Sequence, residues 1–325
     1  MAGSAQAPAL KISTKNIGTS ASIHVASHLG NPSLISVETT RLTAAEKEAL
    51  ATLLDDPSPT VHQALLAQLT GLGTEGRDFL VALAHGTNRV TALTAGEFLR
   101  ELKYADPVAD FRKFIRSLNY ELETGMLLLN RTVNPALDVA GICSQLDALA
   151  ARCRKLTPAS RSLREQCRGI NRVLFAELGL RGNAENYTDP NNCLLEQVLA
   201  RHLGIPLSLS VVYLLVAQRL GLELEPVAAP GHFLVGGYEP GGPFFLDAFN
   251  QGQFLTPDDV FERLRSQQRL PELADLAPTP VREVLSRCCR DLRNHYKATG
   301  DEHHARLFAS FVAEFDLAYE RHAQP

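Results

Sequence analysis

The feature that most constrains the fold of this chain is an almost continuous apolar stretch before Gly221. Residues 207–220 read LSLSVVYLLVAQRL and follow directly on Pro206. A helix that is apolar on nearly every side must be surrounded by other elements, so we expect residues 207–220 to form a buried helix at the centre of a core. The stretch is shorter than the ~20 residues that a membrane-spanning helix needs, so the sequence predicts no membrane contact.

The composition is typical of a globular protein built mainly from helices. The chain has 325 residues, of which 45% are apolar and 21% are charged, and it contains no tryptophan. With aromatic residues at only 6%, leucine, alanine and valine must fill the core, which favours helices. The net charge of −4 gives no basic surplus, so the sequence predicts no binding of nucleic acid.

The first part of the chain is expected to be a tail followed by helices. Residues 1–37 have no continuous apolar segment behind their charges, so they are not a secretory signal, and we expect a disordered tail. Their lack of acids and their serine and alanine content leave organelle targeting as an alternative. Residues 38–109 contain four short helical patterns separated by glycine or proline, which fits a HEAT-like stack of hairpins and a plain helical bundle equally well.

The remainder of the chain is expected to be a core of residues 110–273 and a C-terminal helical hairpin of residues 274–325. Apolar residues recur at helical spacing through residues 111–133, 137–153 and 161–178, and a polar loop precedes Cys193. Residues 232–239 and 243–249 favour two antiparallel strands around EPGG. The sequence therefore predicts an α+β fold that is mostly helical, with helices packed on a small antiparallel sheet.

The six cysteines do not form a recognisable framework. None lies in a CxxC pair, and no cysteine–histidine spacing fits a zinc site. The length and spacing favour reduced thiols in a cytoplasmic protein over disulfides. No glycine-rich phosphate loop is present, so we expect no metal and no organic cofactor.

Cys193 directly follows a turn rich in residues that cap helices, TDPNN. With Asn191 or Asn192 as the cap, Cys193 is predicted to lie in the first turn of a helix over residues 193–203. A helix end contributes only ~0.3–1 kcal/mol, which lowers a thiol pKa by less than one unit. A reactive thiolate therefore needs a second positive partner, and an imidazolium is the usual one.

His232 and Asp247 are the candidates for that partner and for the group that orients it. The sequence predicts that His232 opens the first strand and that Asp247 lies in the second. A turn centred near Pro240 and Gly241 places Asp247 opposite Leu234, which makes His232 and Asp247 diagonal neighbours on one face. A slip of one residue would separate them, so the expectation depends on this register.

Three segments together resemble a known family. NNCLLEQVLARHLGIPLSLSVVYLLVAQRLGL, PGHFLV and LDAFNQG are similar to the transglutaminase-like superfamily, and in particular to its SirB-type branch, which includes an F-box protein of animals. INRVLFAELGLRGNAENYTDPNN resembles the segment that precedes them in that branch. The resemblance covers roughly residues 110–260. It implies a papain-like core in which Cys193, His232 and Asp247 form a catalytic triad.

The resemblance also implies a chemistry, which is acyl transfer from a peptide or protein amide. Cys193 would attack as a thiolate, His232 would move the proton, and Asp247 would hold the imidazole. We expect the backbone N–H of Cys193 to stabilise the oxyanion, assisted by Asn192, Asn183 or Tyr187. The sequence does not indicate whether water or an amine resolves the thioester. An amidase, a peptidase and a transglutaminase therefore remain alternatives.

A second class of function remains open beside the enzyme. Many members of the branch have serine where this chain has Cys193, and a degenerate core between helical regions would suit a scaffold that binds a protein partner. Each candidate also has a purely structural interpretation. Cys193 can be an ordinary buried thiol, His232 a core histidine, and Asp247 the cap of a turn.

Overall fold

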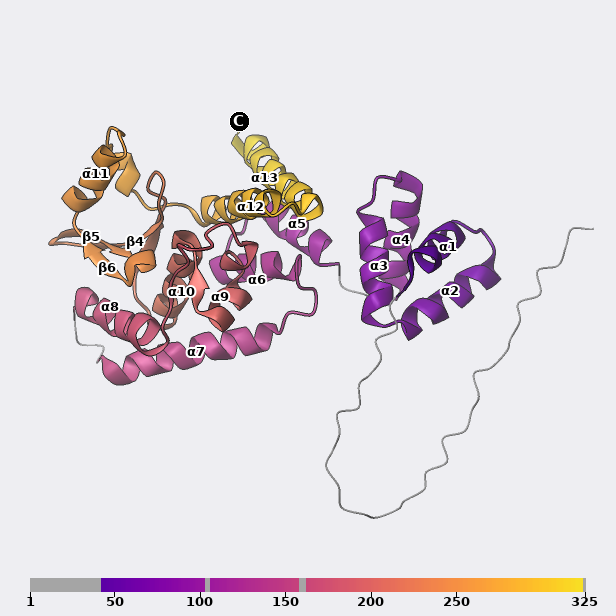
Figure 1. The fold of residues 1–325 in the computed structure, drawn as a ribbon, viewed down its shortest axis with the longest axis horizontal. Coiled ribbons are helices and arrows are strands. Elements are labelled where there is room, and N and C mark those ends of the chain that lie inside the picture. The colour runs from indigo at the N-terminus through magenta and orange to yellow at the C-terminus, as the bar shows by residue number, and fades with distance from the viewer. Residues whose placement is uncertain (1–41, 103–105, 158–161, 324–325) are drawn as a thin grey trace, which may run out of the picture.

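The structure is a computed structural model that describes residues 42–102, 106–157 and 162–323, so the predicted tail of residues 1–37 lies outside the described residues (Figure 1). The helices are α1 (Ala44–Leu54), α2 (Pro59–Gly71), α3 (Thr74–Ala84), α4 (Arg89–Glu101), α5 (Pro107–Ser117), α6 (Leu122–Arg131), α7 (Val139–Leu156), α8 (Leu163–Asn171), α9 (Leu195–Arg201), α10 (Pro206–Arg219), α11 (Pro257–Ser266), α12 (Val281–Ala298) and α13 (Glu302–Ala323). The strands are β1 (Arg181–Gly182), β2 (Leu203–Gly204), β3 (Leu224–Val227), β4 (Leu234–Glu239), β5 (Gly242–Asp247) and β6 (Gln253–Leu255). The fold is mostly helical with a small antiparallel sheet, which confirms the predicted α+β class.

Helices α1 to α4 pack around a hydrophobic cluster of their own, separate from the one that surrounds α10. Leu69 of α2, Leu80 of α3 and Phe98 of α4 are completely buried in it. Helix α4 contacts both α3 and α1, so the last helix of the group lies against the first. A HEAT-like stack of hairpins and a plain helical bundle would both have a shared core. The HEAT-like arrangement therefore stays a prediction.

The helical pattern of residues 111–133 is divided into two helices. Helix α5 ends at Ser117, and Leu118 takes the left-handed conformation with φ +58°, which no α-helix continues through. Helix α6 starts again at Leu122, capped by the side chain of Glu121. The spacing of apolar residues continues across this break, which is why the sequence alone does not predict it.

Helix α10 is the central helix of the larger part, as the sequence predicts. All its residues from Pro206 to Ala217 are buried. It contacts β3 and β4 on one side and α7, α9 and α12 on others, and Figure 1 shows it between the sheet and these helices. An apolar helix of this kind fixes where the sheet and the surrounding helices meet.

The sheet is an antiparallel meander with strand order β3–β4–β5–β6. Val235 pairs with Leu246 and Glu239 with Gly242, so the hairpin turn lies at residues 240–241, and the predicted register is confirmed. The sequence does not predict the outer strands β3 and β6. Strand β3 contains Pro226, which argues against a strand in the sequence but is tolerated here because β3 is at the edge of the sheet.

The C-terminal hairpin of α12 and α13 packs into the same hydrophobic cluster as α10. Phe308, Phe311 and Phe315 of α13 are completely buried, and the ring of Phe311 lies edge-on to that of Phe111 in α5 with centroids 4.9 Å apart. The predicted hairpin is confirmed, with its two helices joined at residues 299–301. The division of the chain into folding units at residue 273 stays a prediction.

Among the helices of the described ranges, none combines the length and the apolar character that a bilayer span requires.

Candidate functional site

His232 and Asp247 form the first half of the candidate site. Nε2 of His232 lies 2.8 Å from Oδ1 of Asp247, a hydrogen bond between the turn before β4 and the end of β5. The sequence predicts that His232 opens the strand, which is wrong by two residues. His232 lies in a turn, where its backbone N–H donates to Ala229 O at 3.0 Å, and β4 begins at Leu234. The imidazole is held firmly, while its side chain stays 24% exposed.

Asp247 is completely buried, and its carboxylate accepts hydrogen bonds from three side chains. Besides His232, Nδ2 of Asn250 donates to Oδ2 at 2.7 Å and Nη1 of Arg263 donates to the same oxygen at 2.6 Å. Burial alone would raise the pKa of this carboxyl, but the bonds from His232, Asn250 and Arg263 outweigh it and hold the pKa of Asp247 well below its usual range. The carboxylate therefore stays charged and orients the imidazole.

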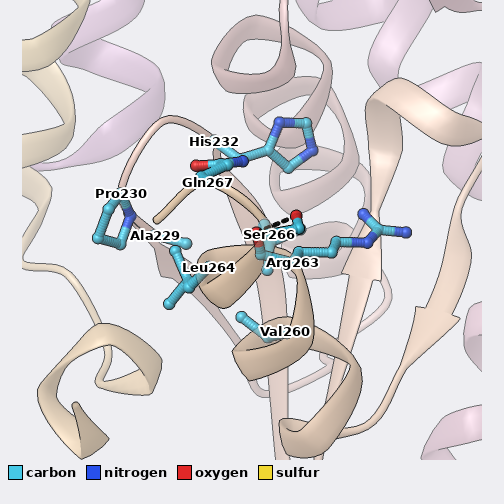
Figure 2. Close-up of a pocket in the computed structure, with 9 residues that line it drawn as sticks. Ala229, Pro230, His232, Val260, Arg263, Leu264, Ser266 and Gln267 are labelled. Atoms are coloured by element: carbon cyan, nitrogen blue, oxygen red, sulfur yellow. Dashed lines mark hydrogen bonds between the residues drawn. The ribbon is translucent and has the colours of Figure 1, made fainter. Parts of the chain in front are cut away.

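A pocket of about 160 Å³ opens beside His232, between the turn before β4 and helix α11. Figure 2 shows Val260 and Leu264 of α11 on one wall and His232 and Arg263 at the polar side. The remaining lining residues are Ala229, Pro230, Leu234, Ser266 and Gln267. The pocket is therefore largely apolar, with one imidazole available at its edge.

Cys193 does not lie in the first turn of a helix, contrary to the sequence-based prediction. Residues Pro190–Asn192 form a 3-10 turn that ends at Cys193, and α9 begins only at Leu195, with Leu194 in an extended conformation between them. The N–H of Cys193 donates to Pro190 O at 3.0 Å, so it is not the free oxyanion donor that we expected. A helix dipole thus makes no direct contribution to the thiol.

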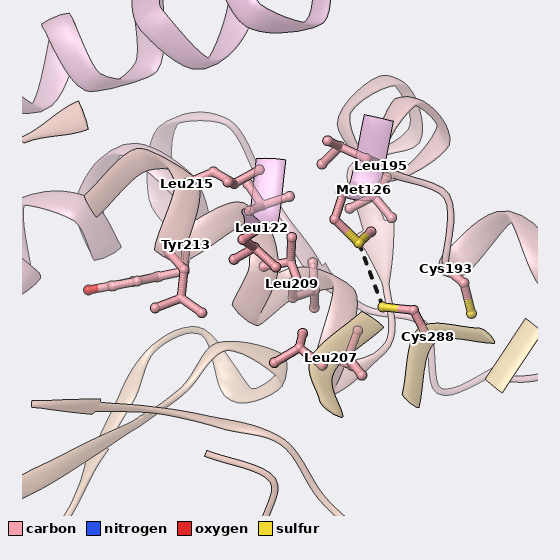
Figure 3. Packing of buried hydrophobic residues seen from close by; sticks show 14 of the residues in the cluster. Leu122, Met126, Cys193, Leu195, Leu207, Leu209, Tyr213, Leu215 and Cys288 are labelled. Carbon is pink, nitrogen blue, oxygen red and sulfur yellow. Dashed lines mark hydrogen bonds between the residues drawn. The ribbon is translucent and has the colours of Figure 1, made fainter. Parts of the chain in front are cut away.

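The thiol of Cys193 is enclosed and bonded to an imidazole that the sequence analysis did not select. Cys193 is 1% exposed, within the core cluster shown in Figure 3. Its Sγ lies 3.3 Å from Nδ1 of His295, which α12 contributes. No hydrogen bond between Cys193 and His232 is found in the described parts of the chain. The structure thus joins His232 to Asp247 and Cys193 to His295.

Both partners of the second pair are held in their neutral forms. Burial raises the pKa of the Cys193 thiol well above its ordinary value, and the carboxylates of Asp291 and Asp189 raise it further. Burial also lowers the pKa of His295, against the opposing effect of the same two carboxylates. In this conformation the sulfur keeps its proton, so the thiol is not activated.

Two aromatic side chains link the two pairs. The ring of Phe249 lies 6.2 Å from that of His232 and 6.3 Å from that of Tyr187, centroid to centroid. Tyr187 in turn stands edge-on to His295 at 5.9 Å. The two imidazoles therefore belong to one region, with Phe249 and Tyr187 forming a chain of ring contacts between them.

The three side chains proposed as oxyanion donors have different environments. Asn183 donates from Nδ2 to Oδ1 of Asn192 at 3.0 Å, and Nδ2 of Asn192 donates to Asn186 O at 2.7 Å. Both amides are therefore used to shape the loop before Cys193. Tyr187 is 44% exposed, so it is the most accessible of the three.

The sequence contains a signal for His295 that becomes clear only with the helix in place. On α12, Cys288, Leu292 and His295 are buried on one face together with Asp291, most of whose surface is also covered. A titratable residue at an apolar position of an amphipathic helix is unusual unless it has a partner. Because Cys193 is 102 residues away in the sequence, no local pattern could identify that partner.

The other thiols and the acids give no sign of a metal centre. All six cysteines are free, and five of them are buried. Sγ of Cys288 lies 3.7 Å from the sulfur of Met126, a contact drawn in Figure 3. Within residues 42–102, 106–157 and 162–323, no group of three or more histidine, cysteine, aspartate or glutamate side chains is placed to hold a metal ion.

The comparison with protein families finds a match to the middle of the chain. Residues 140–290 match the transglutaminase-like superfamily. This part of the chain is therefore similar to transglutaminase-like superfamily domains, and its mostly helical α+β fold is consistent with that similarity. The matched range includes the loop before Cys193, helix α10 and the hairpin that carries His232 and Asp247.

Several bacterial and mammalian proteins are similar to part of the chain. A UPF0162 protein of Xylella fastidiosa (strain 9a5c) is 41% identical over 136 residues, which cover 40% of this chain and 48% of that protein. A UPF0162 protein of Pseudomonas aeruginosa is 30% identical over 51% of this chain and 62% of that protein. F-box only protein 21 of Mus musculus is 40% identical over 40% of this chain and 22% of that protein. The chain thus spans about half the length of the first of these relatives, and no solved structure matches it significantly.

Proposed function

We propose that the protein carries out cysteine-dependent acyl transfer on a peptide or protein amide, as a member of the SirB-type branch with a papain-like Cys193, His232 and Asp247 core. The observation that carries the proposal is the bond between His232 and Asp247. A fully buried, charged carboxylate fixes Nε2 of an imidazole at 2.8 Å, and that imidazole lines a pocket. Such an arrangement keeps one ring nitrogen ready to move a proton near a bound substrate.

The reaction would proceed through a thioester on Cys193. The thiol proton would move to an imidazole of the site, the sulfur would attack the amide carbon, the C–N bond would break, and the departing amine would take a proton from His232. Water or a second amine would then resolve the thioester, which gives an amidase or peptidase in the first case and a transglutaminase in the second. Asp247 would support the charged imidazole through each transfer.

The site would be at rest in the conformation described here. Cys193 is 1% exposed and its thiol is neutral, so a substrate reaches it only after a local opening. Tyr187 is 44% exposed, and its ring leans on both His295 and Phe249. Because it is the most exposed group next to the buried pair, we take Tyr187 as the side chain that moves first.

Replacing Tyr187 with alanine is expected to speed alkylation of Cys193 by iodoacetamide. If the change lowers the free energy of opening by roughly 1.4 kcal/mol, the rate rises about tenfold. The measurement is the rate of modification at the Cys193 peptide by mass spectrometry. Tyr319→Ala is a matched control, because Tyr319 is 56% exposed on α13, and it should leave the rate unchanged. Equal rates for both variants would show that Tyr187 does not cover the thiol.

A non-catalytic module for binding a protein partner through its helical regions is the second candidate. The enclosed, neutral thiol favours it, and so does the similarity to F-box only protein 21, whose name marks an F-box protein. The enzyme and the binding module predict different reactivity for the Cys193 thiol once it is exposed. A thiol that is alkylated readily in Tyr187→Ala, yet forms no thioester with an activated ester, would support the module.

A cytoplasmic location completes the proposal. A reducing compartment keeps cysteines as free thiols. All six cysteines of this chain are free, and five of them are buried.

A further inference from the structure

We propose that His295 of α12 is the base that takes the thiol proton of Cys193, and that His232 serves the leaving amine from the pocket side. This inference rests on the proposed acyl transfer and assigns a second imidazole to it. Nδ1 of His295 lies 3.3 Å from Sγ of Cys193, which is the only imidazole hydrogen bond to that sulfur among the described residues. His232 is committed through Nε2 to Asp247 and lines the pocket.

The position of His295 is fixed by its helix. Only 6% of the residue is exposed, and the neighbouring Leu292 is completely buried in the shared core. Tyr187 packs against the imidazole from the loop that precedes Cys193. An imidazole fixed in this way presents Nδ1 to the sulfur, and in the tautomer with the ring proton on Nε2 this nitrogen is free to accept a proton. It can therefore accept the thiol proton without a change of rotamer.

The charged groups around the pair come from two elements. On α12, Asp291 lies one turn before His295 and accepts a hydrogen bond from Nε of Arg287 at 3.1 Å. From the turn before Cys193, Asp189 acts on both partners and is itself paired with Arg201 at 2.7 Å. The other titratable groups that interact with the thiol are Tyr187, Tyr296 and Cys288. The two carboxylates favour an imidazolium at His295, so they would stabilise the proton once it has moved.

Two imidazoles balance the protons of the whole cycle. In acylation the thiol proton moves to His295, the sulfur–carbon bond forms, the C–N bond breaks, and the protonated His232 gives its proton to the amine. In deacylation the neutral His232 takes a proton from the attacking water, and the departing sulfur recovers its proton from His295. The net reaction is an amide plus water giving an acid plus an amine, and both histidines return to their starting states.

The decisive variant is His295→Asn. The Oδ1 of asparagine can replace Nδ1 as an acceptor for the S–H group, but asparagine cannot hold a proton at neutral pH. We expect this variant to unfold at the same denaturant concentration as the wild type and to lose about 10²–10⁴-fold in the single-turnover rate of Cys193 acylation by 4-nitrophenyl acetate. A merely structural role would leave that rate and its pH profile unchanged, which would overturn the inference.

A second measurement does not require turnover. In ¹⁵N NMR of histidine, Nδ1 of His295 should have the shift of an unprotonated nitrogen at neutral pH, and Cys193→Ala should change that shift. A proton on Nδ1, or no response to Cys193→Ala, would contradict the assignment. If Cys193 is not acylated even in Tyr187→Ala, the proposed acyl transfer fails and the inference with it. If the wild type is acylated but His295→Asn is equally fast, only the inference fails.

Discussion

Replacing Asp247 with alanine is expected to destabilise the protein by about 1–3 kcal/mol, because the side chains that donate to its buried carboxylate would lose their acceptor. Asp247 is fully buried, and it accepts hydrogen bonds from His232, Asn250 and Arg263. Without the carboxylate, the guanidinium of Arg263 would keep only its bond to Gln253 in that region. Urea unfolding followed by circular dichroism measures the change. Asp316→Ala, at an exposed acid of α13, is the control and should alter stability by less than about 0.5 kcal/mol.

The contribution of Asp247 should also depend on pH. The pKa of Asp247 is lower in the folded protein than in the unfolded chain, because the folded structure stabilises the charged carboxylate. The stabilisation is therefore complete above the unfolded pKa of ~4 and is lost as the pH falls from there toward the folded pKa. The difference in unfolding free energy between the wild type and Asp247→Asn should be constant from pH 7 to pH 5 and shrink below pH ~4. A difference that grows with acidity would contradict the charge assigned to Asp247.

Replacing Phe311 with alanine is expected to cost about 3–5 kcal/mol, the usual range for removing a fully buried aromatic side chain. The ring of Phe311 is completely buried and contacts the rings of Phe111 and Phe308. Leu317→Ala is a matched control on the same helix, since Leu317 is 51% exposed, and it should cost less than about 1 kcal/mol.

The shape of the unfolding curve of Phe311→Ala tests how the chain is divided. The hairpin of α12 and α13 shares one core cluster with α10, so the variant should shift a single transition that includes both. A separate early transition, with the rest unchanged, would show instead that residues 274–325 fold as a unit of their own.

The features that were predictable from the sequence are those that depend on local patterns. The apolar run of residues 207–220 required a buried helix, and α10 is that helix. The EPGG turn fixed the register of β4 and β5, which brings His232 and Asp247 together as expected. In both cases the side-chain pattern and the turn residues point to one structure.

The features that were missed depend on backbone geometry or on distant contacts. Pro190 starts a 3-10 turn that ends at Cys193, so the cap-type residues before the thiol do not open an α-helix directly. Leu118 takes a left-handed conformation that leucine rarely adopts, and this ends α5 within an otherwise helical pattern. The pairing of Cys193 with His295 is made by packing between α12 and the loop before α9, which no spacing in the sequence encodes.

Thioester formation at Cys193 tests the proposed acyl transfer most directly. The Tyr187→Ala protein, in which the thiol should be more accessible, would be mixed with 4-nitrophenyl acetate and followed by peptide mass spectrometry. We predict one acetyl group on Cys193 and none at that position in Tyr187→Ala/Cys193→Ser. A Cys193 that iodoacetamide modifies but the ester does not would contradict the account.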